Sequence, residues 1–481
     1  MVNFTEWLQD TNAVRCILVE AVSNSSGSNI TRYLSTKDYS NGSQIYDPVV
    51  NADSVQLIER MSIDGQPSMS FGDIEIANVT GEYDSWLFDI WVNKAIKVLI
   101  GDVRWLYADF VTIFNGIIDD IDTRSINTIN IKIRDKLQQL NTPVTEAKLG
   151  GTTINKNELI PLTFGECFNI SPLLSNPSTL EFQVHNGSIE DIIEVRDNGV
   201  PVTATKNLSN GKFTLPNQPF GQVTCSVQGD KPVTFDNTVS KVIQRIVTSF
   251  GGVSKFTTSD LDVTQLNNFD AADPIPIGLY INSRENTWAI CTQIASGAGA
   301  QLVMSRLGKL QLLKIQIVPD VNSFVIDERD IVQGSLSIVS KLPIMAAFKV
   351  NYDKNWTIQT GLQTGIPKEH KDMYELEYLN VTVEDSTVKT NYALNSEPVA
   401  IDTLMLRESD ATTEANRLLN IYKQPRFIVS FTGTSRLVEL TLGQQVKIKY
   451  PRFGMSVTKD AQVIGLSINW SNLTVKVEVI V

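Results

Sequence analysis

Histidine is scarce in this chain: only His185 and His370 occur among 481 residues. Each stands alone in its stretch of sequence, whereas most hydrolytic sites need a base that titrates near neutrality. The chain also lacks the His-Glu-x-x-His, Gly-x-Ser-x-Gly and Gly-x-x-x-x-Gly-Lys motifs, and it has no Gly-x-Gly-x-x-Gly coupled to a strand. We therefore predict that the protein is not an enzyme and name no catalytic residue.

Cysteine is sparse as well, and no two cysteines form a Cys-x-x-Cys pair. Such a spacing predicts neither a zinc site nor a disulfide framework. We favour buried free thiols, while an iron–sulfur cluster that the fold assembles from all four stays open as an alternative. The prediction is accordingly no cofactor and no metal site. The four residues are Cys16, Cys167, Cys225 and Cys291.

Basic charge and long apolar runs are also missing. The chain has 41 Lys and Arg against 53 Asp and Glu, a formal net charge of −12, which disfavours binding to a phosphate backbone. No apolar run approaches the roughly 18 residues that span a bilayer. Residues 1–7 lack the basic and apolar parts of a secretory signal, so we expect the chain to fold in a cytoplasm.

What is present predicts a folded protein of several domains. Hydrophobic residues make up 42% and charged residues 20%, which is ordinary globular composition. A chain of this length predicts about three to four domains. We expect a first sheet or barrel domain at 1–149, a small inserted β-domain at 150–235, a helix-plus-hairpin domain at 236–335 and a second β-domain at 336–481.

Strand patterns dominate both ends of the chain. The isoleucines of 129–134 alternate with polar residues, and the valines of 473–481 do the same, which is the period of a strand with one buried face. Residues 24–51 are rich in Ser, Asn, Gly and Tyr with little periodicity, and we expect a long loop or extended arm there. The expected fold class is mainly β with a few helices.

Three helices interrupt the strands. Apolar residues at 239–250 fall on one helical stripe that Gly251 and Gly252 end. A second helix is expected to start at Ser283 and to be followed by a hairpin at 301–313. A third is expected at 410–422, where apolar residues recur at helical spacing before Pro425.

Carboxylates and tryptophans offer weaker candidates for a site. Asp119, Asp120 and Asp122 could form a glycosidase pair or a calcium site, as could Asp260 with Asp262, but a solvated turn and a polar loop are the favoured interpretations. Seven tryptophans could stack on sugars. Most lie in apolar stretches, where packing in the core is the ordinary explanation. These are Trp86, Trp91 and Trp288 among others.

Several segments, in the same order along the chain, resemble the tail hub proteins of long-tailed bacteriophages. None is a catalytic signature, and the ordered set carries the resemblance. Together the segments are spread over most of the chain. They are IPLTFGECFNISPLL at 160–174, FQVH at 182–185, VRDNG at 195–199, RLGKLQ at 306–311, VNYDKNWTIQTGL at 350–362, LGQQV at 442–446 and PRFG at 451–454.

The resemblance implies a homotrimeric ring in which each subunit contributes two tube-like β-barrel domains, to match a six-fold tail tube. Such a ring joins the tail tube or distal tail protein to the central fibre or tip protein, and tape measure protein and DNA pass through its lumen without specific binding. An acidic or neutral wall would suit that passage, because Lys and Arg would bind phosphates. Some relatives hold an iron–sulfur cluster with four cysteines in a C-terminal region, whereas no cysteine follows Cys291 here.

Two other functions compete with a structural hub. A receptor- or glycan-binding tail component would be expected to show an exposed aromatic groove and a fibrous repeat, and no repeat of roughly 20 to 50 residues is visible. A tail-associated cell-wall hydrolase would need acid and base groups that converge. The sequence favours the hub over both.

Overall fold

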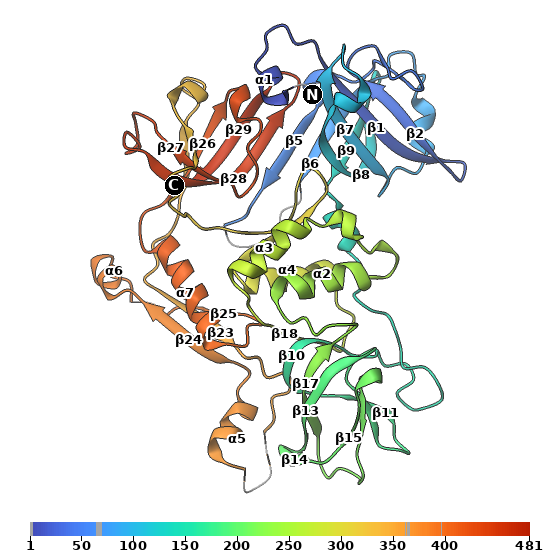
Figure 1. Ribbon diagram of the computed structural model, residues 1–481, viewed down its shortest axis with the longest axis vertical. Coiled ribbons are helices and arrows are strands. Elements are labelled where there is room, and N and C mark those ends of the chain that lie inside the picture. The colour runs from blue at the N-terminus through green and yellow to red at the C-terminus, as the bar shows by residue number, and fades with distance from the viewer. Residues whose placement is uncertain (1–2, 64–69, 361, 363–365, 396) are drawn as a thin grey trace.

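The computed structural model describes residues 3–63, 70–360, 362, 366–395 and 397–481. Met1, Val2 and Gly361, which belong to segments discussed above, lie outside the described residues. Figure 1 shows strands from both termini side by side at one end of the molecule, helices in the middle and smaller sheets at the other end. The predicted class, mainly β with a few helices, is confirmed.

Thirteen strands form the largest sheet, and its first half comes from the N-terminal part of the chain. These strands are β1 (Arg15–Ser25), β2 (Ser28–Ser35), β5 (Gln56–Arg60), β6 (Phe71–Ala77), β7 (Ala95–Asp102), β8 (Val111–Ser125) and β9 (Thr128–Arg134). They run in the order β2-β1-β7-β8-β9-β6-β5. In β9 the face of Ile129, Ile131 and Ile133 is buried as the alternation predicted, while on the other face Lys132 is half-buried and Asn130 is buried as well.

The other half of this sheet comes from the C-terminal part of the chain. Its strands are β21 (Phe324–Ile326), β22 (Ser337–Lys341), β26 (Phe427–Gly433), β27 (Gln445–Ile448), β28 (Lys459–Asn469) and β29 (Thr474–Ile480). Val475, Val477 and Val479 of β29 are fully buried, so the predicted C-terminal strand is confirmed. One apolar cluster contains these valines together with Ile17 and Ile131 from the N-terminal half. The two halves therefore share a core.

Strand β28 joins the two halves. One of its edges pairs with β29, and the other edge is divided between two strands. The first residues of β28 pair with β27, whereas Gly465 to Asn469 pair with β5 from the N-terminal half. Because hydrogen bonds run continuously through this junction, the halves lie edge to edge in a single sheet (Figure 1).

The ladders do not close these thirteen strands into a barrel within the described part of the chain. Single bridges bring each half closer to closure. In the N-terminal half, Leu34 at the end of β2 bridges Asp47, and Val50 then bridges Ile76 of β6. In the C-terminal half, the chain that follows β21 bridges β26 once. The expectation of two closed barrels is therefore wrong for the described residues: each half is an open part of the sheet that only isolated bridges bring closer to closure.

The structure differs from the prediction of a long loop or arm at 24–51. Ser28–Ser35 forms β2, which pairs along its whole length with β1, and the short strands β3 (Tyr39–Ser40) and β4 (Ile45–Tyr46) follow. The hairpin turns at Ser26 and Gly27, whose φ angles of 49° and 89° are left-handed. The alternation in β2 is weak because Ser28 to Thr31 are all exposed. The hairpin therefore projects from the sheet with little pattern in its sequence.

The middle of the molecule is helical. It contains α2 (Val239–Ser249), α3 (Val263–Ala272), α4 (Thr287–Gly297) and the hairpin of β19 (Ala300–Met304) and β20 (Leu310–Lys314). The helix at 239–250 and the hairpin are confirmed. Helix α4 begins four residues later than predicted because Asn286 caps it, accepting a hydrogen bond from the Ala289 N–H at 3.1 Å. Helix α3 was not predicted. Leu266 is its one buried residue, so the helix has no apolar stripe that the sequence could show.

Two smaller sheets share an apolar cluster that includes Cys167, Phe182 and Phe213. One runs β14-β13-β17-β10-β18 and the other β11-β12-β16-β15. The predicted boundaries of the inserted domain stay a prediction, and β18 lies beyond them in sequence. The strands are β10 (Leu162–Ile170), β11 (Leu173–Asn176), β12 (Glu181–Gln183), β13 (Ile189–Asp197), β14 (Val200–Val202), β15 (Thr205–Asn207), β16 (Lys212–Thr214), β17 (Val223–Asp230) and β18 (Gly278–Ile281).

A further unit lies between β22 and β26 in sequence. Helix α7 (Glu408–Tyr422) packs on a sheet of β24 (Leu379–Glu384), β23 (Ala347–Tyr352) and β25 (Ala400–Asp402). Helix α7 confirms the prediction at 410–422. Ala411 and Ala415 are fully buried on it. Glu408 and Asp410 lie in its first turn, where their negative charges interact favourably with the helix dipole. Two short helices, α5 (Lys368–Glu375) and α6 (Ser386–Asn391), complete the unit.

Candidate functional site

The four cysteines are buried free thiols, as predicted. They do not converge: Cys16 and Cys291 belong to two different apolar clusters, and Cys167 and Cys225 share a third. Burial raises the pKa of the Cys16 thiol to about 11 and that of Cys291 to about 12. No group of three or more His, Cys, Asp or Glu among the described residues could hold a metal ion.

Three of the five acidic residues picked out in the sequence form ion pairs. Asp119 and Asp122 do not lie in a turn as predicted, because β8 continues to Ser125. They pair with Arg134 at 3.0 Å and Lys132 at 2.7 Å on the neighbouring strand β9. These cations neutralise the acidic stretch and allow the strand to continue.

The second acidic group serves local structure. Asp260 pairs with Lys136 at 2.7 Å, and the side chain of Asp262 caps α3 by accepting from the Gln265 N–H at 3.1 Å. Asp262 also accepts from the Gln311 side chain at 2.8 Å on β20. Both carboxylates are therefore already occupied by partners within the chain.

The tryptophans examined in the sequence are mostly core residues. Trp86 is 7% exposed and Trp91 is 2% exposed, and the Trp91 indole N–H donates to the Trp86 carbonyl at 2.7 Å. This confirms core packing for both. Trp288 on α4 is partly buried against the cluster of the helical middle.

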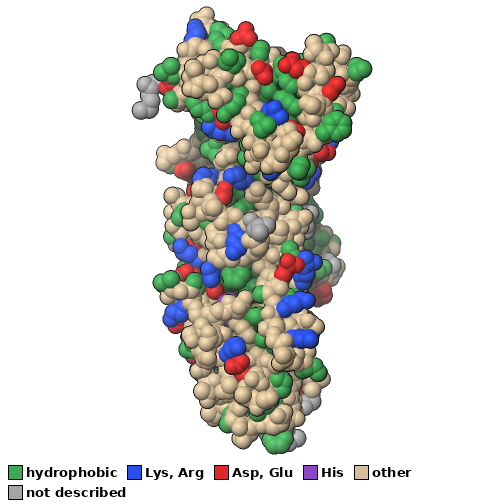
Figure 2. Space-filling model, turned by 90° about the vertical axis from the view of Figure 1, so that its right-hand side faces the viewer, with side chains coloured by type: hydrophobic (Ala, Val, Ile, Leu, Met, Phe, Trp, Pro, Cys, Tyr) green, Lys and Arg blue, Asp and Glu red, His purple; other side chains and the backbone are tan. Residues whose placement is uncertain are grey.

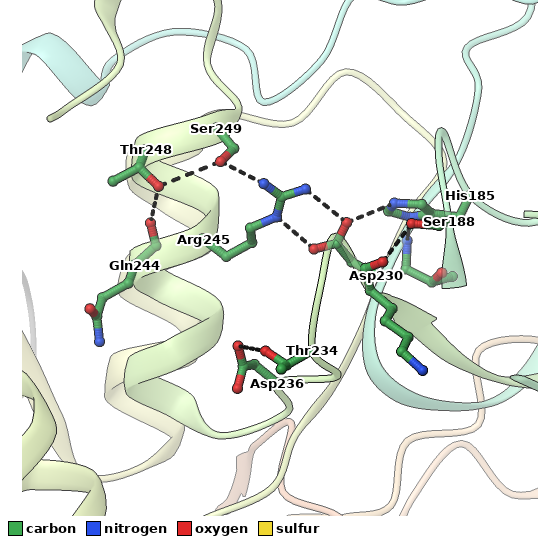
Figure 3. A network of polar contacts seen from close by, with 11 residues as sticks. His185, Ser188, Asp230, Thr234, Asp236, Gln244, Arg245, Thr248 and Ser249 are labelled. Atoms are coloured by element: carbon green, nitrogen blue, oxygen red, sulfur yellow. Dashed lines mark hydrogen bonds and ion pairs between the residues drawn. The ribbon is translucent and has the colours of Figure 1, made fainter. Parts of the chain in front are cut away.

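His185 takes part in a buried polar network (Figure 3). The Thr163 backbone N–H donates to His185 Nδ1 at 3.0 Å, so the ring proton belongs on Nε2. His185 Nε2 then donates to Asp230 Oδ1 at 3.1 Å. With both nitrogens engaged and the residue 1% exposed, this histidine is a structural link and is not placed to exchange protons with a substrate.

Arg245 of α2 completes the network from the other side. It binds both oxygens of Asp230, with Nε at 2.6 Å and a terminal nitrogen at 3.1 Å, and it also donates to Ser249 at 2.7 Å. Burial raises the pKa of Asp230, but the hydrogen bonds from His185 and Arg245 outweigh it and hold that pKa below its ordinary value. The network ties the end of β17 to helix α2. Asp230 and Arg245 were not predicted as partners, because nothing in their spacing along the sequence indicates that they meet.

His370 lies exposed on α5, at the edge of a cavity of about 560 Å³. The inner wall of this cavity is built around Arg196, which is 3% exposed. The rings of Phe168 and Tyr374 stack with centroids 5.8 Å apart, and the Arg196 guanidinium lies 5.2 Å from each. The Arg196 Nε also donates to Glu194 at 2.6 Å. This arrangement fastens α5 to the small sheet.

The path of the large sheet ends at β2 and at β22, and both end strands have an edge open to a partner within the described residues. Strand β22 pairs with β26 alone, and all five of its residues are exposed, with Val339 58% exposed. Strand β2 pairs with β1, and on its outer side only Tyr33 and Ser35 hydrogen-bond to residues 47–50. Ser28 to Arg32 thus present an unpaired edge. Open edges of this kind are places where another chain can add.

Exposed apolar side chains occur at the same end of the molecule. Val79, Phe88 and Ile126 are 73%, 90% and 92% exposed, and the backbones next to Val79 and Ile126 are joined by a hydrogen bond from the Asn78 N–H to the Asn127 carbonyl. Figure 2 shows apolar side chains on the surface at the sheet end, and Lys and Arg mixed with acidic groups further along this face. Contiguous apolar surface is typical of contacts between proteins.

The fold resembles solved phage tail proteins at low sequence identity. A 43 kDa tail protein of prophage MuSo2 from Shewanella oneidensis matches with a TM-score of 0.43 and 12% identity over 97% of this chain and 98% of the other. A tail protein from Neisseria meningitidis MC58 matches with a TM-score of 0.43 and 10% identity, over 97% of this chain and 96% of the other. Prophage tail protein gp18 from Listeria monocytogenes EGD-e matches with a TM-score of 0.44 and 9% identity, over 96% of this chain and 93% of the other.

No family model matches the sequence, and no curated protein matches it. Among the described residues, no helix is long and apolar enough to cross a membrane.

Proposed function

We propose that this chain is a structural protein of a phage tail, the hub at the distal end of the tail tube, and that it is not an enzyme. The observation that carries the proposal is the junction at β28, which places two β-rich halves edge to edge in one sheet with a shared core. The ordered sequence segments that resemble tail hub proteins agree with it. A building block of two fused half-sheets is what a ring of alternating units requires.

Three copies of such a block would form a ring of six half-sheets, which matches a six-fold tube. Each copy has an open edge at β2 in its N-terminal half and another at β22 in its C-terminal half. Contacts between the first edge of one copy and the second edge of the next are heterologous, and they close when the rotation between copies is one third of a turn. Ring closure would also remove edges that make a monomer prone to aggregate.

In this proposal the ring connects the tail tube or distal tail protein to the central fibre or tip protein. The tape measure protein and the DNA pass through its lumen, and the protein resides in the virion after synthesis in the host cytoplasm. The formal net charge of −12 supports a lumen that does not retain DNA. A structure of the ring with a wall lined mainly by Lys and Arg would contradict this part of the proposal.

The absolute mass of the purified chain tests the ring directly. Light scattering coupled to size exclusion, across a range of concentrations, is expected to give three times the subunit mass of 53.4 kDa. A monodisperse monomer at every concentration would overturn self-assembly of the hub. Adding the purified distal tail protein in that case distinguishes a ring that closes only on its partner from a chain that does not form rings.

A further inference from the structure

A groove with a volume of about 600 Å³ lies where three parts of the chain meet. Its walls come from the start of β8, from the hairpin β19–β20, and from the loop that precedes β27. They are mainly apolar, and three of the molecule's separate apolar clusters border it. Its apolar lining includes Ile113, Met304, Leu313, Val438 and Leu442.

Two buried side chains that line this groove each have a polar atom without a hydrogen bond among the described residues. Glu59 of β5 is 3% exposed, and its Oε2 accepts no hydrogen bond there, although it forms an ion pair with the Arg306 Nε at 3.5 Å. Trp470 is 4% exposed, and its indole N–H donates to nothing in the described part of the chain. A buried donor or acceptor without a hydrogen bond is unfavourable, so both atoms favour a ligand that supplies one.

Arg306 forms an ion pair with Glu59, whereas the hydrogen bonds of its guanidinium go to backbone carbonyls. Its guanidinium donates to the carbonyls of Val438 and Leu440 and lies 6.0 Å from the ring of Trp470. Burial raises the pKa of Glu59, with Arg306 acting in the opposite direction. The groove therefore combines apolar walls with one acceptor and one donor, both held in place by the fold.

One wall of the groove is an unpaired strand edge. The first residues of β8, Val111 to Phe114, pair with β7 on one side, whereas pairing with β9 on the other side begins only at Ile117. Between them, the Asn115 N–H donates to the Arg306 carbonyl at 2.8 Å. Within the described chain, no strand lies along the outer side of Val111 to Phe114. An extended peptide can add to such an edge.

We propose that this groove binds an extended apolar peptide segment of a neighbouring tail protein. A peptide group supplies an N–H that can donate to Glu59 and a carbonyl that can accept from Trp470, and its apolar side chains fit the walls. Because the groove borders both the large sheet and the helical middle, a bound segment would fix the two parts against each other. Only the source of the peptide rests on the function proposed above.

The test uses N-acetyl-leucine methylamide as the probe, which has two peptide groups and one apolar side chain. Titration of the full chain, followed by saturation-transfer NMR, is expected to show saturable millimolar binding. Trp470→Phe keeps an aromatic side chain, although a smaller one, and removes the N–H, and it should weaken binding about 3- to 10-fold. The analogue methylated on both nitrogens should bind more weakly to the unaltered chain, because it cannot donate to Glu59.

Trp288→Phe is the matched control, since the Trp288 indole N–H also lacks a partner but Trp288 does not line the groove. It should leave the affinity unchanged. Thr441→Trp, at an exposed position of the groove's lining, should block the probe even if Trp470→Phe folds poorly. Absence of saturable binding, or equal affinity in all variants, would overturn the proposal. If the chain is a trimer but does not bind the probe, only the peptide-binding groove is refuted. If it is a monomer that binds the probe, only the trimeric ring is refuted.

Discussion

Glu59 of β5 stands directly opposite Leu466 of β28 in antiparallel register. The pair unites strands from the two ends of the chain, and both residues are buried on the sheet. The neighbouring Arg60 and Glu478 add an ion pair at 3.1 Å across the same junction. Since the core beneath is also shared, the N-terminal and C-terminal halves are expected to lose their structure together.

The first prediction concerns Asp135, a buried carboxyl at the end of β9. Burial raises its pKa to about 7, against an ordinary value near 3.9 in the unfolded chain. Because the folded state binds the proton more tightly, the stabilisation is complete below about pH 4 and is lost as the pH rises to about 7. Asp135→Asn should remove this slope, which is at most about 1.4 kcal/mol per pH unit. Denaturant unfolding from pH 5 to pH 8 measures it.

Asparagine keeps the cap of the turn at 136–140, where Asp135 accepts from the Leu137 N–H, but its NH2 group cannot accept from the Ser70 N–H as Asp135 does. The comparison therefore uses the pH slope and not the absolute free energy of unfolding. Asp327→Asn is the control. Hydrogen bonds from Arg329 lower the pKa of Asp327 to about 2, so its contribution does not change between pH 5 and pH 8. An equal slope in Asp135→Asn and the unaltered chain would contradict the prediction.

The second prediction concerns Asp230 in the network of Figure 3. Asp230→Ala leaves Arg245 and the His185 N–H without their partner, and we expect it to lower the free energy of unfolding by about 2 to 4 kcal/mol. Because the pKa of Asp230 is lowered, its stabilisation is present above about pH 4 and is lost as the pH falls further. Denaturant unfolding at pH 7 and pH 3.5 should show a smaller difference between the chains at the lower pH.

Asp191→Ala provides the comparison for that prediction. Asp191 pairs with Lys206 at 2.8 Å, and both side chains are 41% exposed, so its loss should cost about 0 to 1 kcal/mol. If the two variants were equally destabilised, the buried network would have no special role in holding β17 to α2.

The third prediction concerns Gly278 of β18, which pairs with Gly165 of β10. A Cβ atom at Gly278 would overlap the carbonyl oxygen of Glu166, and backbone cannot yield as a flexible side chain can. Gly278→Ala should therefore destabilise the small sheet by several kcal/mol, roughly 2 to 4, as overpacking against backbone does. Hydrogen exchange should show lost protection in β10 and β18 first.

Gly334→Ala is its control, because Gly334 has open space around its Cβ position and only its φ of 76° disfavours alanine. We expect Gly334→Ala to lower the free energy of unfolding by about 1 kcal/mol. Equal effects at the two glycines would mean that close approach of the strands does not limit this site.

Local periodicity was enough to predict the strands at 129–134 and 473–481 and the helices at 239–250 and 410–422. In each, most of the apolar side chains at the periodic positions are buried, so the sequence itself carries the pattern. The hairpin of β1 and β2 was missed because the exposed start of β2 has no alternation. Its turn at Ser26-Gly27 is the signal that could have indicated it.

Contacts between distant segments could not be predicted from one sequence. The pairing of β5 with β28 depends on hydrogen bonds between backbones, which every residue offers equally. The same holds for the groups that build a site. Asp230, His185 and Arg245 meet only after three elements have packed, and the atoms of Glu59 and Trp470 that lack a hydrogen bond among the described residues are recognisable only once their burial is known.

The last prediction tests the open edge at β22. Val339 lies at a bulge between Ile338 and Ser340, is 58% exposed and is outside the pairing register with β26. Val339→Lys should therefore leave the fold intact and, because a lysine on an edge strand opposes pairing, reduce the trimer fraction at least about tenfold in light scattering. Val457→Lys, 72% exposed in a loop, is the matched control and should keep the trimeric mass. Trimers of undiminished stability in Val339→Lys would place the contact between copies elsewhere and leave β22 as a surface strand.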